Sequence, residues 1–377
     1  MSATHRVEFI GFLSHREASE ARPGDGPLVD KAFLGACARA QEHAGFDRAL
    51  IAYHSTAPDG LQVAAQAAQE TRRLGLLVAH RPGVIAPTVA ARQFATFDHF
   101  SDGRAAINII SGGDAAEQRR DGDFLDHDER YARTDEYLDV LKHAWRSREP
   151  FDFEGRYYRV KEHFAQVQPL QAHLPIYFSG SSPAALKVAG RHADVFMMWG
   201  EPLAGIAEQI AAVRAAAARH GRAGAVRFSL SVRPILGATE AEAWARAERV
   251  RDAVRTRLGS ARPAGGMPQN TGSQRLLEFA ARGEVLDSCL WTGITALTGA
   301  SSGAAASTGI GGNSTALVGT PEQVADALVA YHRLGVDTFL VRGFDLLADA
   351  LQYGSELLPR VRGKIPASIP AAALAPF

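Results

Sequence analysis

Polar side chains that can do acid–base chemistry recur just after short apolar segments of this sequence. Histidines follow three such segments, at His15, His54 and His80. Histidine exchanges a proton near neutral pH and can therefore serve as a general acid or base. We expect His15 and His80 to be candidates for proton transfer, with His54 close enough to compete with His15 or to contact a substrate. The alternative for all three is a solvated histidine at the rim of the fold.

Other residues at the ends of apolar segments suggest substrate binding, and Arg233 among them is also a candidate catalytic residue. Arg233 and Arg342 each follow such a segment, and Trp199 ends another. If both guanidinium groups point into one opening, they would hold a sulfonate, sulfinate or carboxylate by charge-assisted hydrogen bonds. A salt bridge at the rim, for example with Asp345, is the competing interpretation for Arg342.

The turn at 179–183 is the clearest single motif, and it reads Ser-Gly-Ser-Ser-Pro. Small residues let the backbone approach a ligand, Ser181 and Ser182 offer hydroxyl groups, and a predicted helix begins directly afterwards. Together these features favour a phosphate group, although an ordinary helix N-cap has the same pattern. His127 and Tyr131 lie four residues apart and can share one helical face toward the same opening, or form a surface pair.

Several classes of protein are excluded by composition and spacing. Lys+Arg and Asp+Glu both number 41, so the chain lacks the basic field of a nucleic-acid-binding protein. The two cysteines, Cys37 and Cys289, are far apart, and no spacing typical of a metal site occurs. A Gly-x-Ser-x-Gly string at 299–303 lacks the strand and helix of a nucleophile elbow. Without a signal peptide or an apolar run of about 20 residues, we expect a cytoplasmic protein with no membrane partner.

The elements that must position these residues alternate along the whole chain. Eight short apolar segments are separated by helical patterns, which predicts an α/β fold, a (β/α)8 TIM barrel in a single domain over 1–377. A doubly wound sheet is the alternative, and it is disfavoured because no G-x-G-x-x-G follows the first strand. The predicted strands are 7–13, 48–52, 74–79, 105–110, 175–179, 195–198, 227–232 and 338–341.

Three segments interrupt this alternation and are predicted to be insertions at the C-terminal mouth of the barrel. A charged stretch at 114–132 and a small hairpin within 150–172 are expected on the rim. The segment 259–314 is rich in Gly, Ala, Ser and Thr, and we expect it to be a mobile lid loop over the mouth. A linker without function is the alternative for this segment.

With these residues in view, the chain resembles the FMN-dependent alkanesulfonate monooxygenase group of the bacterial-luciferase-like family. The motifs cover nearly the whole chain and fall in the expected order. They are LVAHRP at 77–82, APTVAAR at 86–92, DGR at 102–104, NIISG at 108–112, DHDERY at 126–131, YFSGSS at 177–182, WGEP at 199–202 and TALVG at 315–319.

The resemblance implies a two-component monooxygenase. A separate NAD(P)H-dependent reductase would supply reduced FMN as a dissociable co-substrate, and O2 would react with it to give a flavin C4a-(hydro)peroxide. That species would oxygenate a small organic substrate, with organosulfur compounds of the alkanesulfonate kind as the suggested class. A homodimer or homotetramer is also expected.

Site residues carry over from the resemblance position by position. Ser181 and Ser182 would hold the FMN phosphate. His127 and Tyr131 would bind along the phosphate–ribityl side. Asn108 and the strand end formed by Ala52 and Tyr53 would line the isoalloxazine ring.

Departures from the family pattern leave the substrate open. The family cysteine after strand two falls near Ala57, and the family Arg-x-His after strand seven is Ser-Val-Arg at 231–233. The family's lid arginine falls at about Thr298, and its tyrosine after strand eight is Phe344. Hydride transfer with the deazaflavin F420 and a non-catalytic flavin-binding protein therefore remain alternatives. His15 matches a family histidine, whereas His80 aligns with an apolar residue.

Overall fold

Eight parallel strands close into a barrel in the computed structural model, which describes residues 6–259, 268–300 and 315–365. The last strand of the ring pairs with the first, and β8 pairs with β9, so that no edge remains between them. The prediction of a (β/α)8 barrel is confirmed. In spatial order the strands are β1 (Glu8–Leu13), β2 (Arg48–Ile51), β3 (Gly75–His80), β4 (Ala105–Ile110), β7 (Ile176–Ser179), β8 (Val195–Trp199), β9 (Arg227–Leu236) and β13 (Thr338–Val341).

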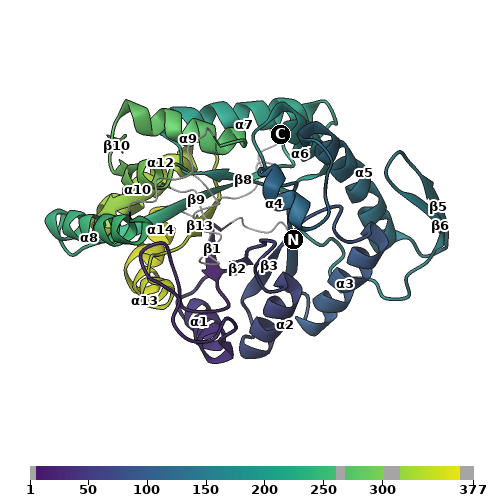
Figure 1. Ribbon diagram of the computed structural model, residues 1–377, viewed down its shortest axis with the longest axis horizontal. Helices are drawn as coiled ribbons and strands as arrows, with labels where there is room; N and C mark the ends of the chain where they lie inside the picture. Colours follow the sequence, from purple (N-terminus) through teal and green to yellow (C-terminus); the bar gives the residue numbers. More distant parts are fainter. Residues whose placement is uncertain (1–5, 260–267, 301–314, 366–377) are drawn as a thin grey trace, which may run out of the picture.

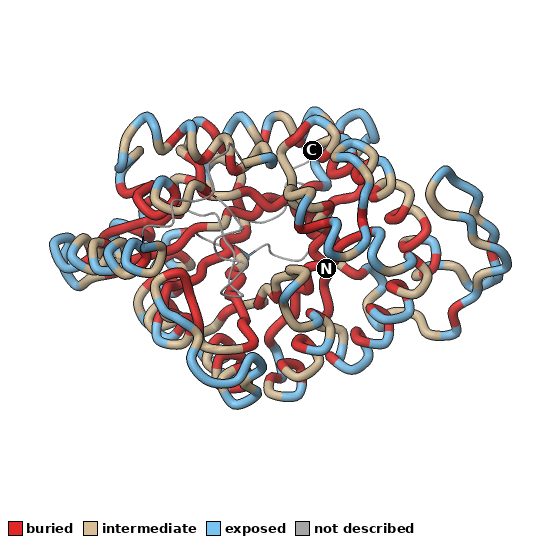
Figure 2. The backbone as a smooth tube through the Cα atoms, viewed as in Figure 1, coloured by how far each residue is buried: buried red, intermediate tan, exposed pale blue. Residues whose placement is uncertain are grey.

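Helices surround these strands as a ring, with buried residues on the inside of the ring and exposed residues on the outside (Figures 1 and 2). Their ends follow local sequence signals: Thr239 and Thr320, for example, each form a capping box with the residue at the third helical position. The ring contains α1 (Lys31–His43), α2 (Gly60–Glu70), α3 (Pro87–Phe100), α5 (His127–Arg146), α6 (Pro183–His192), α7 (Leu203–Ala218), α8 (Glu240–Leu258), α12 (Pro321–Arg333), α13 (Leu346–Gln352), the π-helical η1 (Tyr353–Leu357) and α14 (Leu358–Lys364).

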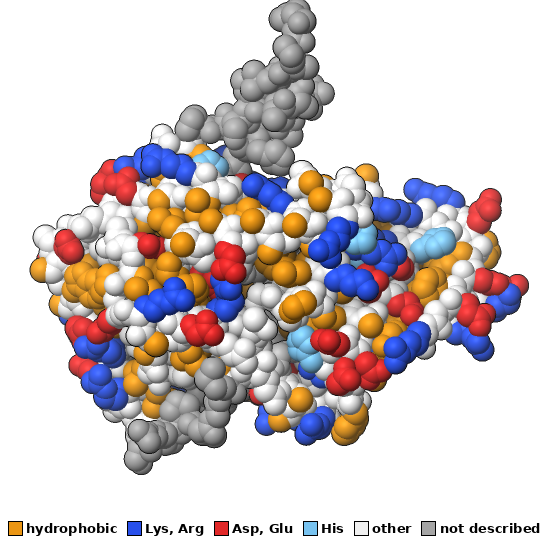
Figure 3. All heavy atoms as spheres, turned by 90° about the horizontal axis from the view of Figure 1, so that it is seen from above, with side chains coloured by type: hydrophobic (Ala, Val, Ile, Leu, Met, Phe, Trp, Pro, Cys, Tyr) orange, Lys and Arg blue, Asp and Glu red, His pale blue; other side chains and the backbone are white. Residues whose placement is uncertain are grey.

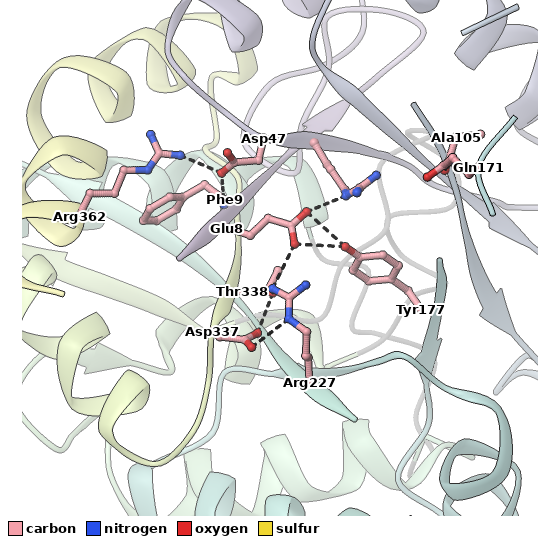
Figure 4. A network of polar contacts seen from close by, with 11 residues as sticks. Glu8, Phe9, Asp47, Ala105, Gln171, Tyr177, Arg227, Asp337, Thr338 and Arg362 are labelled. Atoms are coloured by element: carbon pink, nitrogen blue, oxygen red, sulfur yellow. Dashed lines mark hydrogen bonds and ion pairs between the residues drawn. The ribbon is translucent and has the colours of Figure 1, made fainter. Parts of the chain in front are cut away.

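Ion pairs fill the N-terminal end of the barrel (Figure 4). The carboxylate of Glu8 accepts a hydrogen bond from Arg48 Nε at 2.6 Å, one from Arg227 Nη2 at 3.3 Å and one from Tyr177 Oη at 3.3 Å. Arg227 also donates to Asp337 at 2.9 Å. Above this layer, apolar side chains such as Ile10, Leu77 and Leu340 pack against one another. The space at the other end of the strands is therefore the one in which a ligand can bind.

The predicted insertions take different forms. The segment 114–132 contains α4 (Ala115–Arg120) and the first turn of α5. The hairpin of β5 (Phe151–Glu154) and β6 (Arg159–His163) projects beyond α5 (Figure 1), and its backbone N–H groups at Tyr157 and Arg156 donate to Glu136. No residue of 150–172 lines the large cavity at the mouth.

Composition predicts a mobile lid loop over 259–314, and residues 268–300 of this segment form regular elements. They are α9 (Thr271–Arg282), β10 (Val285–Leu286), β11 (Leu290–Trp291) and α10 (Gly293–Thr298), and β11 pairs with β12 (Ala316–Gly319) beside β9. Leu276, Phe279 and Trp291 are buried and supply the apolar surface that holds these elements. Residues 260–267 and 301–314 lie outside the described residues.

On the face of the molecule seen in Figure 3, acidic and basic side chains are mixed. Within the described ranges, no helix has both the length and the apolar composition needed to cross a bilayer.

Candidate active site

A cavity of about 370 Å³ opens at the C-terminal ends of the barrel strands. Apolar side chains from β1, β2 and β8 form much of its wall, and polar groups from the strand ends project among them. Most of the predicted site residues line this cavity: His15, Ala52, Tyr53, His54, Asn108, His127, Tyr131, Ser181, Ser182 and Trp199. The structure therefore brings together residues that are dispersed over most of the sequence.

His80 is predicted as a catalytic residue, but the structure places it away from the cavity. Side chains alternate along β3, so that Ala79 faces the cavity and His80 faces the helices. His80 Nε2 lies 2.6 Å from Tyr137 Oη, and its ring packs edge-on against Phe94. Burial lowers the pKa of His80 to about 4. Its position supports a packing role, and the prediction of proton transfer has no support here.

Arg233 and Arg342, predicted to hold an anionic substrate, are both paired with Glu20. This carboxylate belongs to the loop between β1 and α1, and it lies 2.8 Å from Arg233 Nη1 and 2.9 Å from Arg342 Nη2. Burial disfavours the charged form of Glu20, yet the two arginines outweigh burial and lower its pKa. Neither arginine lines the cavity.

The Arg233 guanidinium is also held by contacts other than the one with Glu20. Its guanidinium lies 3.4 Å from the centre of the Phe344 ring, and Nη2 donates to the carbonyl of Gly343 at 2.8 Å. With the Glu20 carboxylate on Nη1, this side chain is held as part of the protein interior. The prediction that Arg233 is catalytic or binds substrate has no support from its position.

The turn after β7 forms a cradle suited to a phosphate. Gly180 has φ +141°, and a Cβ atom there would lie 2.6 Å from Tyr131 Oη, so glycine is needed at this position. Ser182 caps α6, its Oγ accepting from the Ala185 N–H at 3.2 Å, and it is hydrogen-bonded to Tyr131. Burial raises the pKa of Tyr131 to about 12, so its hydroxyl stays protonated and can donate. His127 packs against Tyr131 with ring centres 5.0 Å apart.

A second helix begins beside this cradle, and sequence reasoning missed it. Asn270 caps α9 by accepting from the Ser273 N–H at 2.7 Å, and Asn270 to Gly272 line the cavity. A Cβ atom at Gly272 would lie 2.7 Å from the Trp199 ring and 3.6 Å from Ser181 Oγ. The Asn-Thr-Gly-Ser sequence is itself an N-cap signal, hidden within a segment interpreted as a loop.

Arg81 and two carboxylates form a third part of the site that was not predicted, and they contact Tyr53, which was. We call Tyr53, Arg81, Glu117 and Asp121 the Arg81 cluster. Arg81 lies 2.6 Å from Glu117 Oε2 and 3.3 Å from Asp121 Oδ2, and Tyr53 Oη donates to Asp121 at 2.7 Å. Burial and the bond to Asp121 raise the pKa of Tyr53. Because Ala79 faces the cavity, alternation along β3 places Arg81 there too, and this was the signal available in the sequence.

Three polar atoms in the cavity wall are buried and have no hydrogen-bond partner among the described residues. They are Asn108 Oδ1, His15 Nε2 and Arg81 Nε, and each side chain belongs to a residue at most 7% exposed. Such atoms are costly unless a ligand or water satisfies them. Burial, with a smaller effect of Arg16, lowers the pKa of His15, so this histidine is neutral near pH 7.

These features fit a phosphorylated, planar and polar ligand. The cavity volume lies within the range of roughly 300–1,000 Å³ of small-molecule sites. One end offers a helix N-terminus and hydroxyl groups for a phosphate, and the wall near Asn108 offers unsatisfied polar atoms for a ring. Across the part of the chain that the structure describes, no group of three or more His, Cys, Asp or Glu side chains is placed to hold a metal ion.

Comparison with known proteins gives a family and a set of shared folds. The luciferase-like monooxygenase family matches residues 7–338. A riboflavin lyase solved with a modified FMN and its substrate riboflavin superposes with a TM-score of 0.76, at 23% identity over 97% of this chain and 93% of that chain.

Two further solved structures share the fold. The EDTA monooxygenase from Chelativorans sp. BNC1 superposes with a TM-score of 0.73, at 20% identity over 97% of this chain and 96% of that chain. An F420-dependent secondary alcohol dehydrogenase superposes with a TM-score of 0.67, at 16% identity over 94% of this chain and 99% of that chain. At these identities the likeness shows a common fold.

Proposed function

Because the chain belongs to the luciferase-like monooxygenase family, we propose that it is a two-component monooxygenase that uses reduced FMN and O2 to oxygenate a small organic substrate. The observation that carries the proposal is the cavity at the strand ends, where the Ser181–Ser182 turn, Tyr131 and Asn108 meet. A separate NAD(P)H-dependent reductase would supply the flavin as a dissociable co-substrate. A homodimer or homotetramer remains a prediction from the sequence.

The phosphate of FMN is assigned to the cradle after β7. Ser182 and the start of α6 lie at this point, and Tyr131 Oη lies against Gly180. A helix N-terminus attracts an anion through its free N–H groups and its dipole. The start of α9, next to Ser181, adds a second set of such groups. His127 lies beside Tyr131 and would border the ribityl chain.

The isoalloxazine ring is assigned to the wall formed by Asn108 and the strand end at Ala52 and Tyr53. Asn108 Oδ1, which has no partner among the described residues, would accept a hydrogen bond from the ring. When bound, reduced flavin supplies the electrons that activate O2. The chain itself binds and orients the reactants, and the start of α9 together with Trp199 limits the access of water.

His15 is the residue we assign to proton transfer. Its Nε2 is buried in the cavity wall and has no partner among the described residues. Because its pKa is lowered, the neutral ring can accept a proton from the substrate at Nε2 and return it later. His54, held by Thr56 Oγ1 2.8 Å from its Nδ1, lines the same cavity and would contact the substrate.

Anaerobic titration of the full-length protein with reduced FMN, oxidised FMN and reduced F420 tests the proposal. We expect reduced FMN to bind at least about tenfold more tightly than the other two. Preference for F420 would indicate hydride transfer, and tight oxidised FMN without turnover would indicate a flavin-binding protein. With an FMN reductase and NADH, a panel of sulfides, sulfones, sulfonates and heterocycles then identifies the substrate, and a true substrate gains one atom from isotopically labelled O2.

A further inference from the structure

The ionisable groups around the cavity indicate the charge of the substrate, on the premise of the proposed function that this cavity is where the substrate binds. Arg81 is the only lysine or arginine among the described residues of the cavity wall. Three carboxylates share that wall, those of Asp114, Glu117 and Glu201. Any charge on a substrate must be balanced against these groups.

Arg81 is already more than balanced. Glu117 and Asp121 both pair with its guanidinium, at 2.6 Å and 3.3 Å, so that this ion-pair set carries one more negative than positive charge. The pKa of Glu117 is lowered, because Arg81 and the Ser55 N–H outweigh the burial that would raise it. Glu117 therefore stays ionised near neutral pH. Because two carboxylates already neutralise the Arg81 guanidinium, it does not provide a counter-charge for an anionic substrate.

The other charged groups that line the cavity also have partners. Glu201 forms a two-pronged ion pair with Arg275, with both bonds at 2.8 Å. The Asp114 carboxylate accepts from the first N–H groups of α4. His127 Nδ1 lies 2.7 Å from Asp128 Oδ1. None of these groups offers an unpaired positive charge.

The two histidines on the substrate side do not add positive charge either. Burial lowers the pKa of His15, and Arg16 lowers it further. Burial also lowers the pKa of His54, although Glu117, 4.0 Å away, acts in the opposite direction. Both rings are neutral near pH 7. Arg233 and Arg342, the two arginines predicted to supply charge, share the single carboxylate of Glu20, and neither of them lines the cavity.

We propose that the substrate is uncharged or cationic, with an aromatic or aliphatic body, and that sulfonates and carboxylates are poor substrates. An anion placed beside the Arg81 cluster loses its hydration without gaining a counter-charge, and the surplus carboxylate repels it. A neutral group can instead use the partnerless Arg81 Nε–H and His15 Nε2. Phe12, Leu50 and Val63 in the wall suit an apolar body. Neutral organosulfur compounds, such as sulfides and sulfones, stay within this class.

Three probes of one shape and different charge test the proposal: benzamidine, benzamide and benzoate, with benzenesulfonate as a fourth. Their affinities for the full-length protein, with and without FMN, are measured by calorimetry and by intrinsic tryptophan fluorescence, to which Trp199 in the wall contributes. We expect benzamide and benzamidine to bind at least about tenfold more tightly than benzoate or benzenesulfonate. Equal or tighter binding of either anion, or no binding of any probe, would overturn the proposal.

Glu117→Gln provides a second readout. Removing one carboxylate leaves Arg81 balanced by Asp121 alone, so the ratio of benzoate to benzamidine affinity should rise at least about tenfold. Glu17→Gln, at an exposed ion pair with Arg22, is the control and should leave the ratio unchanged. The ratio of benzoate to benzamidine affinity does not depend on the fraction of protein that is active. If the Glu117→Gln variant does not fold, the affinities of the four probes for the wild type alone decide the test. The probe measurements require no turnover. A result that contradicts the proposed substrate charge is therefore distinct from a flavin titration that contradicts the proposed function.

Discussion

The guanidinium carbon of Arg81 lies 4.4 Å from the centre of the Tyr53 ring, and both side chains reach Asp121 Oδ2. This contact joins the ends of β3 and β2 with the loop after α4. An interaction of this kind is worth about 0.5–2 kcal/mol, depending on how far water is excluded. It also fixes the plane of the Tyr53 ring in the cavity wall, where we expect the flavin to lie.

Replacing Arg81 by lysine tests the contacts of Arg81 with Tyr53, Glu117 and Asp121. Arg81→Lys keeps the charge but loses the planar fork that binds Glu117 and Asp121 and stacks on Tyr53. We expect kcat/KM to fall by about 10- to 100-fold, corresponding to about 1.4–2.8 kcal/mol of lost stabilisation. Steady-state kinetics with a reductase measures it. Arg119→Lys, at an exposed position of α4, is the control and should keep full activity; an Arg81→Lys enzyme as active as the control would refute the role.

Gly180→Ala tests the phosphate cradle. The new methyl group would meet Tyr131 Oη and Ala185 Cβ, at a φ value that residues with side chains rarely adopt. We expect FMN affinity to fall at least about tenfold, while riboflavin, which lacks the phosphate, loses at most about threefold. Gly224→Ala is the control, because open space surrounds that position. Equal losses for both flavins would mean that the phosphate lies elsewhere.

Glu20→Gln tests the burial of Arg233 and Arg342. Removing one partner of a buried ion pair leaves uncompensated charge, which typically costs about 3–5 kcal/mol. We therefore expect the free energy of unfolding to fall by about 3 kcal/mol, measured by urea denaturation. Glu17→Gln on the same loop should change it by less than about 0.5 kcal/mol. A small effect at Glu20 would show that the two arginines do not depend on this carboxylate.

The buried His80 predicts acid sensitivity. Its pKa is about 4 in the folded protein against 6.5 as the ordinary value, so below pH 6.5 the unfolded chain takes up a proton that the folded chain does not. Stability is therefore lost as the pH falls from 6.5 toward 4, by up to about 3 kcal/mol from this group. His80→Asn should reduce the loss between about pH 7 and pH 4.5. The exposed His43→Asn should not, and an unchanged pH dependence in His80→Asn would contradict the assignment.

Much of the fold and part of the site follow from local patterns. The eight strands were predictable because each is a short apolar run bounded by turn residues, and the ends of parallel strands meet at one mouth. Ser182 and Gly180 were predictable because a helix start after a small-residue turn has a local signature. The alternation of side chains along β3 also separates Arg81 from His80, and it indicates that His80 faces away from the cavity.

The rest depends on contacts between distant segments. Arg342 and Glu20 are 322 positions apart, and no local pattern indicates that a loop carboxylate will cover an arginine at the end of β13. The pairing of Arg81 with Glu117 depends in the same way on how α4 folds back over the mouth. The α9 helix was obscured by the Gly- and Ser-rich residues around it, although Leu276 and Phe279 lie at helical spacing.

The central claim is that this cavity binds reduced FMN with its phosphate at the Ser181–Ser182 turn. The most direct measurement is the anaerobic affinity of reduced FMN relative to reduced riboflavin, in the wild type and in a Ser181→Ala, Ser182→Ala variant. We predict that the wild type prefers reduced FMN by at least about tenfold and that the variant loses most of this preference. Equal affinities for the two flavins in the wild type, or a preference unchanged in the variant, would contradict the account.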